Sequence, residues 1–566
     1  MTESGDKDNR TVYEILAEDR FSGQEITEKD RQLLELEVAL NQRIDEYLLK
    51  NPRRIPKAVY FIVPNEFGER FCFYGIKPLL TLFFPRWSGI SKEYSKVLVH
   101  TFSMLSYFTP LIGGAISDSY LAKYHTIVYL SILYFLGCVL LAVFSINGLL
   151  GTAPNIPVAA LFAPLVMIAM GTGGIKPCVS THGGDQYLPN QRQGIDWFFT
   201  VFYTSINAGA TISMNVSPIL KDNVQCFGDS CYFGSFMMCA LVFGAVTILF
   251  IFGRRYYRIV PAVGEFLPWK ALKVPFIAGW RYFKATREER ARRRNWLSFS
   301  DEVVGAPFVE ETRQLGIMLS AIIPMIFFWM IYNQLSTEWQ IQYVMMENAV
   351  GSVRISSENF QVINSVLIII LVPTLGLLYP WIERRGFRCT PLRRMGAGYI
   401  LVITSFIISG VLQMAVDDRY NPTLNAKGDV IACDGCLHIF YQLPQWFLIS
   451  LAEAFTSPTG LLFCYEEVGR ALKAQSTSFW LFFISLGDLV VAAVEASLLQ
   501  NPVVKGPSKY FMYSGVGAAS FVWYLIQGYF YKYKADRELI AKREQTDNNY
   551  ESEQEKPEVL KMEANP

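Results

Sequence analysis

Twelve apolar segments, joined by mostly short polar connections and one long charged insert, dominate this 566-residue chain. An α-helix needs about 20 consecutive apolar residues to cross the hydrocarbon core of a bilayer. Inside lipid every backbone polar group must be satisfied within the segment, which favours helices. The sequence therefore predicts an all-α polytopic membrane protein with twelve transmembrane helices in two six-helix bundles. The segments lie near residues 58–85, 95–116, 125–147, 157–178, 196–218, 233–253, 314–335, 358–382, 394–416, 438–463, 475–499 and 510–533.

The long insert and the two polar ends set the predicted domain boundaries. Composition agrees with a membrane protein and not with a soluble enzyme, because 51% of the residues are hydrophobic and only 18% are charged. The net charge of +1 gives no reason to expect nucleic-acid binding. The predicted parts are a cytosolic N-terminal tail with a short amphipathic helix (1–57), an N-terminal bundle (58–253), a basic cytosolic linker (254–311), a C-terminal bundle (312–533) and a cytosolic C-terminal tail (534–566).

Arginine and lysine residues gather on one side of the predicted topology. They are dense in residues 254–258 and 290–294 of the linker and in 384–394, which joins the eighth and ninth segments. Because cytosolic loops carry an excess of Lys and Arg, we expect this side and both termini to be cytosolic. The linker also mixes aromatic with basic residues, a composition that would suit the inner leaflet. These aromatic residues are Trp269, Phe276, Trp280 and Phe283.

Two cysteine pairs fall in polar loops on the opposite side. Cys226/Cys231 and Cys433/Cys436 would lie outside the cell or in a lumen, where disulfides persist. Short loop-stapling disulfides are therefore the first interpretation of both pairs. A metal site or redox motif at residues 433–436 is the weaker alternative, because no redox fold accompanies it. We predict no metal site.

The first apolar segment contains charges that lipid does not tolerate. Glu66, Glu69, Arg70 and Lys77, together with Tyr74, fall on one side of a helix at about 100° per residue. Each buried charge costs several kcal/mol unless it is paired or hydrated. The stripe is therefore predicted to face a cavity. The alternative is a set of salt bridges that only locks helices together.

Two further charges lie in apolar surroundings. Lys176 ends the fourth segment and needs a carboxylate partner, for which Glu66 or Glu69 is the natural candidate. Glu453 is a lone acid within the tenth segment. A cavity with cations from the first half of the chain and an acid from the second suits a zwitterion. Aromatic residues between the two ends would bind variable side chains, so a short peptide fits the description.

Other polar and aromatic residues recur at helical spacings. His100 and Tyr107 are seven residues apart, whereas Tyr203 and Asn207 are four apart, so each pair shares a helix face. His100 could exchange protons near physiological pH, although the alternative is an interfacial, hydrogen-bonded histidine. In the second half the candidates are Trp329, Asn333, Asn364 and Trp480, for which core packing of the tryptophans is the alternative.

Three motifs resemble the proton-coupled oligopeptide transporters, a family of the major facilitator superfamily. Residues 66–75 (EFGERFCFYG) resemble the E-x-x-E-R-F-x-Y-Y-G signature, and residues 113–127 resemble the G-G-x-x-A-D-x-x-L-G-x-x-x-T-I segment. Residues 202–209 resemble the F-Y-x-x-I-N-x-G segment. The resemblance covers about 58–533 and implies two bundles that rock about a central site.

The resemblance also implies roles for individual residues. The implied proton-coupling set is Glu66, Glu69, Arg70, Lys176, His100 and Glu453. The implied substrate-binding set is Arg70, Tyr74, Lys77, Tyr107, Lys176, Tyr203, Asn207, Trp329, Asn333, Asn364, Glu453 and Trp480.

The chain departs from the family pattern at several positions. Phe73 replaces the first signature tyrosine, and Asn333 stands where many members carry an acid, which removes the expected partner of Lys77. Leu462 replaces a common glutamate. The outer loop 417–437 is short, so the large extracellular domain of animal members is missing. This favours a fungal or protist type.

Taken with the resemblance, these patterns favour a monomeric, proton-driven symporter of di- and tripeptides, with protons as its only coupling partner and no cofactor. We expect it in the plasma membrane first and in a vacuolar or lysosomal membrane second. Two alternatives stay open: a carrier of nitrate or another small solute, and a non-transporting nutrient receptor. No nucleophile–base set supports an enzyme.

Overall fold

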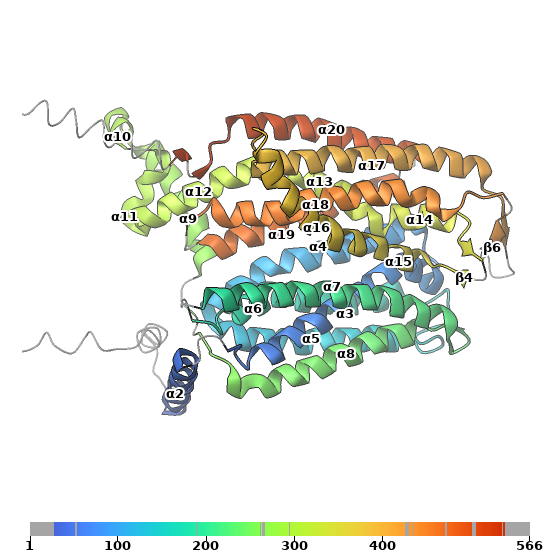
Figure 1. The fold of residues 1–566 in the computed structure, drawn as a ribbon, viewed down its shortest axis with the longest axis horizontal. Helices are drawn as coiled ribbons and strands as arrows, with labels where there is room; N and C mark the ends of the chain where they lie inside the picture. Colours follow the sequence, from blue (N-terminus) through green and yellow to red (C-terminus); the bar gives the residue numbers. More distant parts are fainter. Residues whose placement is uncertain are drawn as a thin grey trace, which may run out of the picture.

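The computed structural model describes most of the chain between the two tails. The described residues are 28–50, 54–188, 191–260, 262, 266–293, 295–351, 353–424, 430–433, 435–469, 472–500, 505–534 and 536–537. Long helices run side by side along the molecule (Figure 1). The tails at 1–27 and 538–566, with any role they have, lie outside the described residues.

The helices of the first half follow the predicted apolar segments closely, with ends shifted by a few residues. Between α4 and α5 a short helical turn covers Ser117–Leu121, and Ala122 there has a φ of 59°. The backbone leaves the helical path at this point, because L-residues rarely adopt positive φ within a helix. The helices are α3 (Val59–Ser88), α4 (Lys92–Ile116), α5 (Ala122–Phe144), α6 (Val158–Gly184), α7 (Arg192–Asn223) and α8 (Tyr232–Phe252).

The second half also follows the predicted segments but has one broken helix. We predict a single segment over 314–335, whereas the structure has a bend of 50° between Ile322 and Met325. Pro324 lies in this break; proline lacks the N–H of a helical bond and its ring clashes with the preceding turn. The helices are α12 (Ala306–Ile322), α13 (Met325–Tyr332), α14 (Glu338–Val344), α15 (Ser357–Phe360), α16 (Val362–Glu383), α17 (Pro391–Arg419), α18 (Leu443–Glu466), α19 (Lys473–Gln500) and α20 (Pro507–Phe530).

Hydropathy identifies the protein as a polytopic membrane protein. Within the described residues, seven helices are long and apolar enough to cross a membrane, or eight if the bent pair counts as one span. That count treats Lys92–Phe144 as one run, although it contains the break at Ala122. Helix α3, which carries Glu66, Glu69, Arg70 and Lys77, is not among these candidate spans.

The two largest hydrophobic cores lie one in each half of the chain. The buried members of the first core lie between Ala58 and Ile259, and those of the second between Leu315 and Tyr524. Within the first, Gly113 of α4 meets α6 so closely that a Cβ would lie 2.2 Å from the Cα of Gly174. Gly113 begins the segment 113–127 that resembles the family motif, and small residues at such a contact let two helices approach closely.

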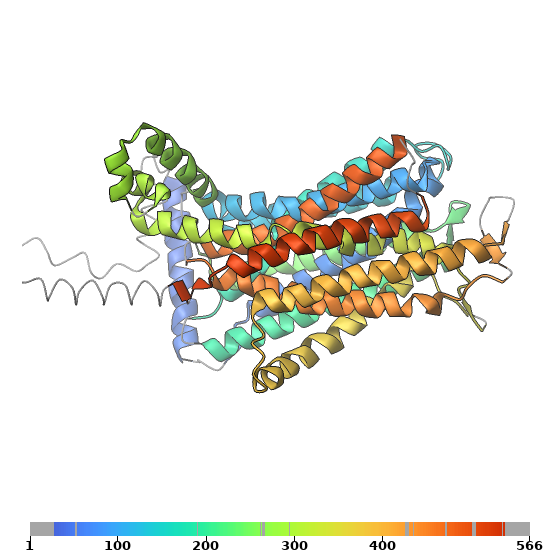
Figure 2. The same ribbon diagram turned by 90° about the horizontal axis from the view of Figure 1, so that it is seen from above.

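The two ends of the molecule differ (Figures 1 and 2). One end, which we call the insert end, carries α2 (Glu28–Lys50), α9 (Leu267–Lys284), α10 (Arg287–Arg292) and α11 (Asp301–Val304). The other, the hairpin end, carries the pairs β3–β4 (Ala349–Val350 and Val353–Arg354) and β5–β6 (Pro422–Leu424 and Val430–Cys433).

A third hairpin, β1–β2 (Gln225–Cys226 and Asp229–Ser230), follows α7 and holds a disulfide. Cys226 bonds to Cys231, five residues later, as the loop-stapling interpretation predicts. Cys436 is also disulfide-bonded. The side chain of Cys433, its predicted partner, lies outside the described residues.

Candidate functional site

A cavity of about 2140 Å³ lies between the two halves of the chain and reaches the insert end, where Phe266 and Trp269 join its wall. Residues from both cores line it. Most of the predicted site residues lie on this wall. They are Glu66, Arg70, Tyr74, Lys77, Tyr107, Lys176, Tyr203, Asn207, Trp329, Asn333, Asn364 and Glu453.

Arg70 on α3 joins the two signature carboxylates. Its Nε lies 2.8 Å from Glu66 Oε1, one helical turn away, and 2.8 Å from Glu69 Oε2. The hydroxyl of Thr172 on α6 donates a hydrogen bond to Glu69. All three α3 side chains are buried, and Glu66 and Arg70 reach the cavity wall. A proton gained or lost by either acid therefore changes the charge balance around Arg70 directly.

The expected pairing of Lys176 with Glu66 or Glu69 is wrong for this conformation. The Lys176 ammonium lies 3.8 Å from the ring centroid of Tyr107 and 5.5 Å from that of Phe73. Aromatic faces attract cations through the ring quadrupole. Arg70 already pairs with both carboxylates, and the Lys176 side chain lies against the two aromatic rings at the cavity wall.

Glu453 on α18 anchors the opposite wall. Tyr332 donates a hydrogen bond of 2.5 Å to Glu453 Oε2, and the Asn364 amide donates one of 3.0 Å to the same oxygen. Ser450 holds Asn364 by donating to its Oδ1 at 2.6 Å. Sequence analysis missed Tyr332, although it lies three residues after Trp329 and next to Asn333.

The predicted aromatic residues lie either on the cavity wall or behind it. Trp329 lines the cavity, whereas Trp480 does not and is wrong as a direct contact residue. Trp480 is buried behind the wall, edge to face with Trp329 at 5.8 Å, and packs where a Cβ on Gly460 would clash with it. Tyr203 is half exposed, and Asn207 donates to its carbonyl at 2.9 Å.

His100 lies outside the cavity wall in a buried contact between the halves. Its Nδ1 is 2.8 Å from Asp488 Oδ1 on α19, and its Nε2 is 2.9 Å from Thr337 Oγ1. Sequence analysis missed Asp488. As an acid within the apolar run 479–492, it carries the same signal that identified Glu453.

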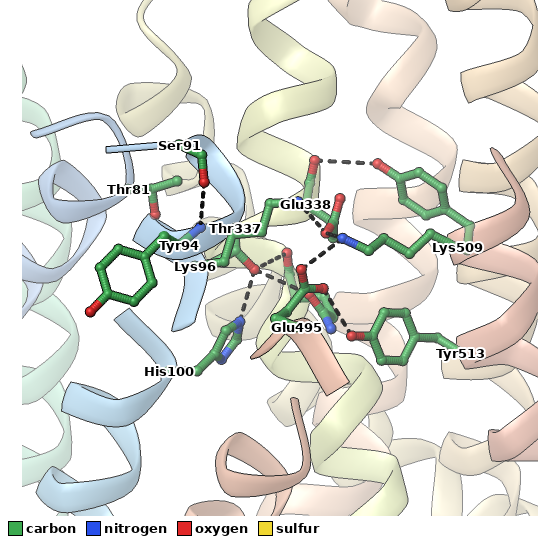
Figure 3. A network of polar contacts seen from close by, with 12 residues as sticks. Thr81, Ser91, Tyr94, Lys96, His100, Thr337, Glu338, Glu495, Lys509 and Tyr513 are labelled. Carbon is green, nitrogen blue, oxygen red and sulfur yellow. Dashed lines mark hydrogen bonds and ion pairs between the residues drawn. The ribbon is translucent and has the colours of Figure 1, made fainter. Parts of the chain in front are cut away.

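A charge network closes the hairpin end (Figure 3). Lys96 of α4 lies 2.5 Å from Glu338 of α14, so it joins the two halves. Lys509 of α20 lies 3.0 Å from Glu338 and 2.7 Å from Glu495 of α19. Tyr513 donates to Glu495 at 3.0 Å. We call these five residues the outer network; all are buried.

A second ion pair also joins the halves. Lys221 of α7 lies 2.8 Å from Glu358 of α15, and both are buried. The Thr81 hydroxyl donates to the carbonyl of Ser336 at 2.8 Å, which adds a neutral contact between α3 and the second half. With these contacts at the hairpin end and the cavity reaching the insert end, the conformation is open toward the insert.

Lys77 and Asn333 lie on the cavity wall without forming a charged gate, as the sequence predicts. The Asn333 amide donates to the carbonyl of Ile484 at 3.5 Å. Lys77 forms no ion pair with any residue that the structure describes. The charged contacts that hold the halves together lie instead in the outer network and at Lys221.

Comparison with known proteins gives consistent matches. Solute carrier family 15 member 1 of Rattus norvegicus is 34% identical over 374 residues, covering 64% of this chain and 52% of the relative. Peptide transporter family 1 of Drosophila melanogaster is 36% identical over 409 residues, covering 72% and 53%. The matches span about half the length of these relatives. Both are animal proteins, which gives no support to the fungal or protist type.

Solved structures match over almost their whole length. The in meso crystal structure of the POT family transporter PepTSo has a TM-score of 0.69 and 25% identity, covering 84% of this chain and 98% of that one. An auto-inhibited POT family peptide transporter matches in fold with a TM-score of 0.68 and 22% identity, covering 84% and 98%.

A family match extends over most of the membrane-spanning region. The sequence profile PTR2, POT family, matches residues 124–512, which is more than half of the chain. The match includes Lys176, the Glu453 wall and most of the outer network. This chain belongs to the POT family.

Proposed function

We propose that this protein is a proton-driven symporter of di- and tripeptides. The observation that carries the proposal is the distribution of charge around the cavity. Arg70, Lys77 and Lys176 line it from the first half of the chain, beside Glu66, and Glu453 lines it from the second, where Arg313 is paired with Glu310. A short peptide presents a carboxylate to the first set and an amine to the second. The names of the matched relatives and structures support the same substrate class.

Arg70 links peptide binding to proton binding. While Glu66 and Glu69 are ionised, both hold the guanidinium through Nε. Protonation of one acid removes a competing anion and leaves Arg70 to bind the peptide carboxylate, with Lys176 beside it. Planar guanidinium–carboxylate contacts are strong and directional. In the same step, the Lys176 ammonium leaves the Tyr107 ring and contacts the peptide carboxylate.

The peptide amine replaces the neutral hydrogen-bond donors at Glu453. The Tyr332 hydroxyl and Asn364 amide now point at the same carboxylate oxygen. An ammonium group offers more donors and a full charge, so it binds this acid more strongly than either neutral group. The aromatic wall, which includes Trp329, then accepts different side chains.

Alternating access follows from the two cores. In our proposal twelve spans form bundles over 58–253 and 312–533, with the basic linker 254–311 and both termini in the cytosol. The present conformation is then open to the cytosol, with the outer network sealing the far side. Each charge crossing a 100 mV potential contributes about 2.3 kcal/mol, so membrane voltage drives accumulation. We propose that the transporter acts as a monomer in the plasma membrane, with a vacuolar or lysosomal membrane as the alternative.

Reconstitution into proteoliposomes tests the function. With an inward proton gradient and a pH-sensitive dye inside, we expect dipeptides and tripeptides to accumulate and to acidify the interior. A panel of peptides with different side chains should compete, whereas nitrate should not. Competition by nitrate alone would favour the small-solute carrier. Peptide binding without any flux would favour the nutrient receptor.

A further inference from the structure

Helix α9 in the insert carries an exposed apolar stripe, whose first two residues, Trp269 and Leu272, also lie at the cavity wall. Five large side chains of this helix are exposed, including Phe276 at 72% and Phe283 at 81%. At about 100° per residue they span roughly 80° of the helix surface. We call them the α9 stripe. Its residues are Trp269, Leu272, Phe276, Trp280 and Phe283.

The opposite face of α9 fixes the direction of this stripe. Val274 and Ala278 are fully buried and pack with Leu297, Phe299 and Val309. These partners lie in the insert and at the start of α12, so α9 is docked on the rest of the protein through one face. The stripe on the other face is thus left exposed by the fold, and an apolar surface of this kind marks an interaction site.

Lysines flank the stripe along one edge. The Lys273 ammonium lies 5.6 Å from the Trp269 ring centroid, and the Lys284 ammonium lies 4.3 Å from that of Trp280. Helix α9 contains no acidic residue. Tryptophan and lysine side by side on an exposed helix face are typical of helices at an anionic membrane surface, where rings enter the interface and ammonium groups contact headgroups.

The connections of α9 keep it close to the membrane. Only residues 253–266 separate it from the end of α8, and an extended chain of that length reaches at most about 50 Å. Residues 285–305 tie its other end to α12. Inner-leaflet lipid is therefore always within reach of the stripe. A soluble protein partner would not be held nearby in this way, so we favour lipid as the binding partner.

We propose that α9 binds the inner leaflet, with the α9 stripe in the interface and Lys273 and Lys284 on anionic lipid headgroups. The proposal rests on the cytosolic orientation of the insert and is independent of the transported substrate. Trp269 and Leu272 also line the cavity. Lipid binding therefore holds one margin of the cavity mouth at the membrane surface.

Hydrogen–deuterium exchange of the full-length protein in nanodiscs tests this surface. One set of discs contains phosphatidylcholine alone, and the other contains phosphatidylcholine with phosphatidylserine. We expect amides of residues 267–284 to exchange at least about tenfold more slowly in the anionic discs, because each surface Lys or Arg adds to membrane attraction. Equal exchange in both lipids would overturn the proposal.

Two variants and a matched control separate charge from folding. The double variant Lys273→Glu and Lys284→Glu should lose the difference between lipids, while exchange in α17 stays unchanged. Lys92→Glu makes a charge reversal at the exposed start of α4 and should keep the difference. If the double variant keeps the full difference, or if Lys92→Glu removes it, α9 is not the anionic-lipid site.

Discussion

The outer network and the cavity both bury charge. Both contain ion pairs, since Arg70 in the cavity pairs with Glu66 and Glu69, but Lys176 and Glu453 of the cavity are held by neutral groups. In the outer network Lys96 and Lys509 share Glu338 at 2.5 and 3.0 Å, and Glu495 completes the set. In the cavity Lys176 rests on a tyrosine ring. Glu453 there is held by neutral donors.

This difference indicates that the outer network holds the two halves together, whereas the cavity binds a ligand. Charges that neutralise one another across the two halves stabilise one arrangement of those halves. Charges held by rings and neutral groups are only partly compensated, so a ligand of opposite charge replaces those contacts at low cost. The predictions below alter one region at a time, from the largest expected effect to the smallest.

Lys176→Ala should give the largest loss. It removes a cavity cation that either the peptide carboxylate or an ionised signature acid requires as a partner. We expect proton-driven accumulation to fall by about 100-fold or more, because leaving a buried charge without its partner costs about 3–5 kcal/mol. Uptake in proteoliposomes measures the effect. Lys92→Ala, at the exposed start of α4, serves as the control and should transport normally.

Glu338→Gln should weaken the lock without touching the cavity. Lys96 loses its carboxylate, whereas Lys509 keeps Glu495, so the cost is only partly offset. We expect the equilibrium to shift by about ten- to a hundredfold toward the conformation that is open at the hairpin end. Faster hydrogen–deuterium exchange in α14 reports this shift. The exposed Glu93 provides the control variant Glu93→Gln. Unchanged exchange in α14 would show that the network does not lock the halves.

Glu453→Gln should weaken recognition of the peptide amine. A hydrogen bond to a charged group contributes about 1.5–3 kcal/mol, so we expect roughly ten- to a hundredfold weaker binding of free dipeptides. N-acetylated peptides lack the ammonium charge, so their weaker binding should hardly change. Competition assays on both peptide types measure the contrast. Glu466→Gln, on an exposed position of the same helix, is the control. An equal loss for both peptide types would contradict this role of Glu453.

Asp488→Asn should have the smallest effect of the four. The variant keeps the shape of the contact with His100 but removes the negative charge 2.8 Å from the ring. We expect uptake to fall by about three- to tenfold, because a histidine that transfers protons depends on a neighbouring carboxylate to orient its ring. Uptake should also respond less to external pH, which a purely structural contact does not require. A lower rate with an unchanged pH profile would leave His100 only a structural role.

Local sequence patterns predicted the helices and most of the cavity wall. The stripe on α3 and the lone acid Glu453 were recognisable because charge within an apolar run is costly. Asp488 and Glu495, seven residues apart on α19, carried the same signal and were overlooked. Lys96 and Lys509 lie near the starts of their helices, where charge is ordinary. Their burial depends on Glu338 from a distant part of the chain, which no local pattern reveals.

The most direct measurement is peptide-dependent proton flux through the reconstituted protein. With wild type, adding a dipeptide outside under an inward proton gradient should acidify the interior and concentrate the peptide. In the Lys176→Ala variant both signals should fall to background. Peptide accumulation that persists when both the pH gradient and the membrane potential are absent, or proton entry that is independent of the peptide, would contradict proton-coupled peptide transport by this cavity.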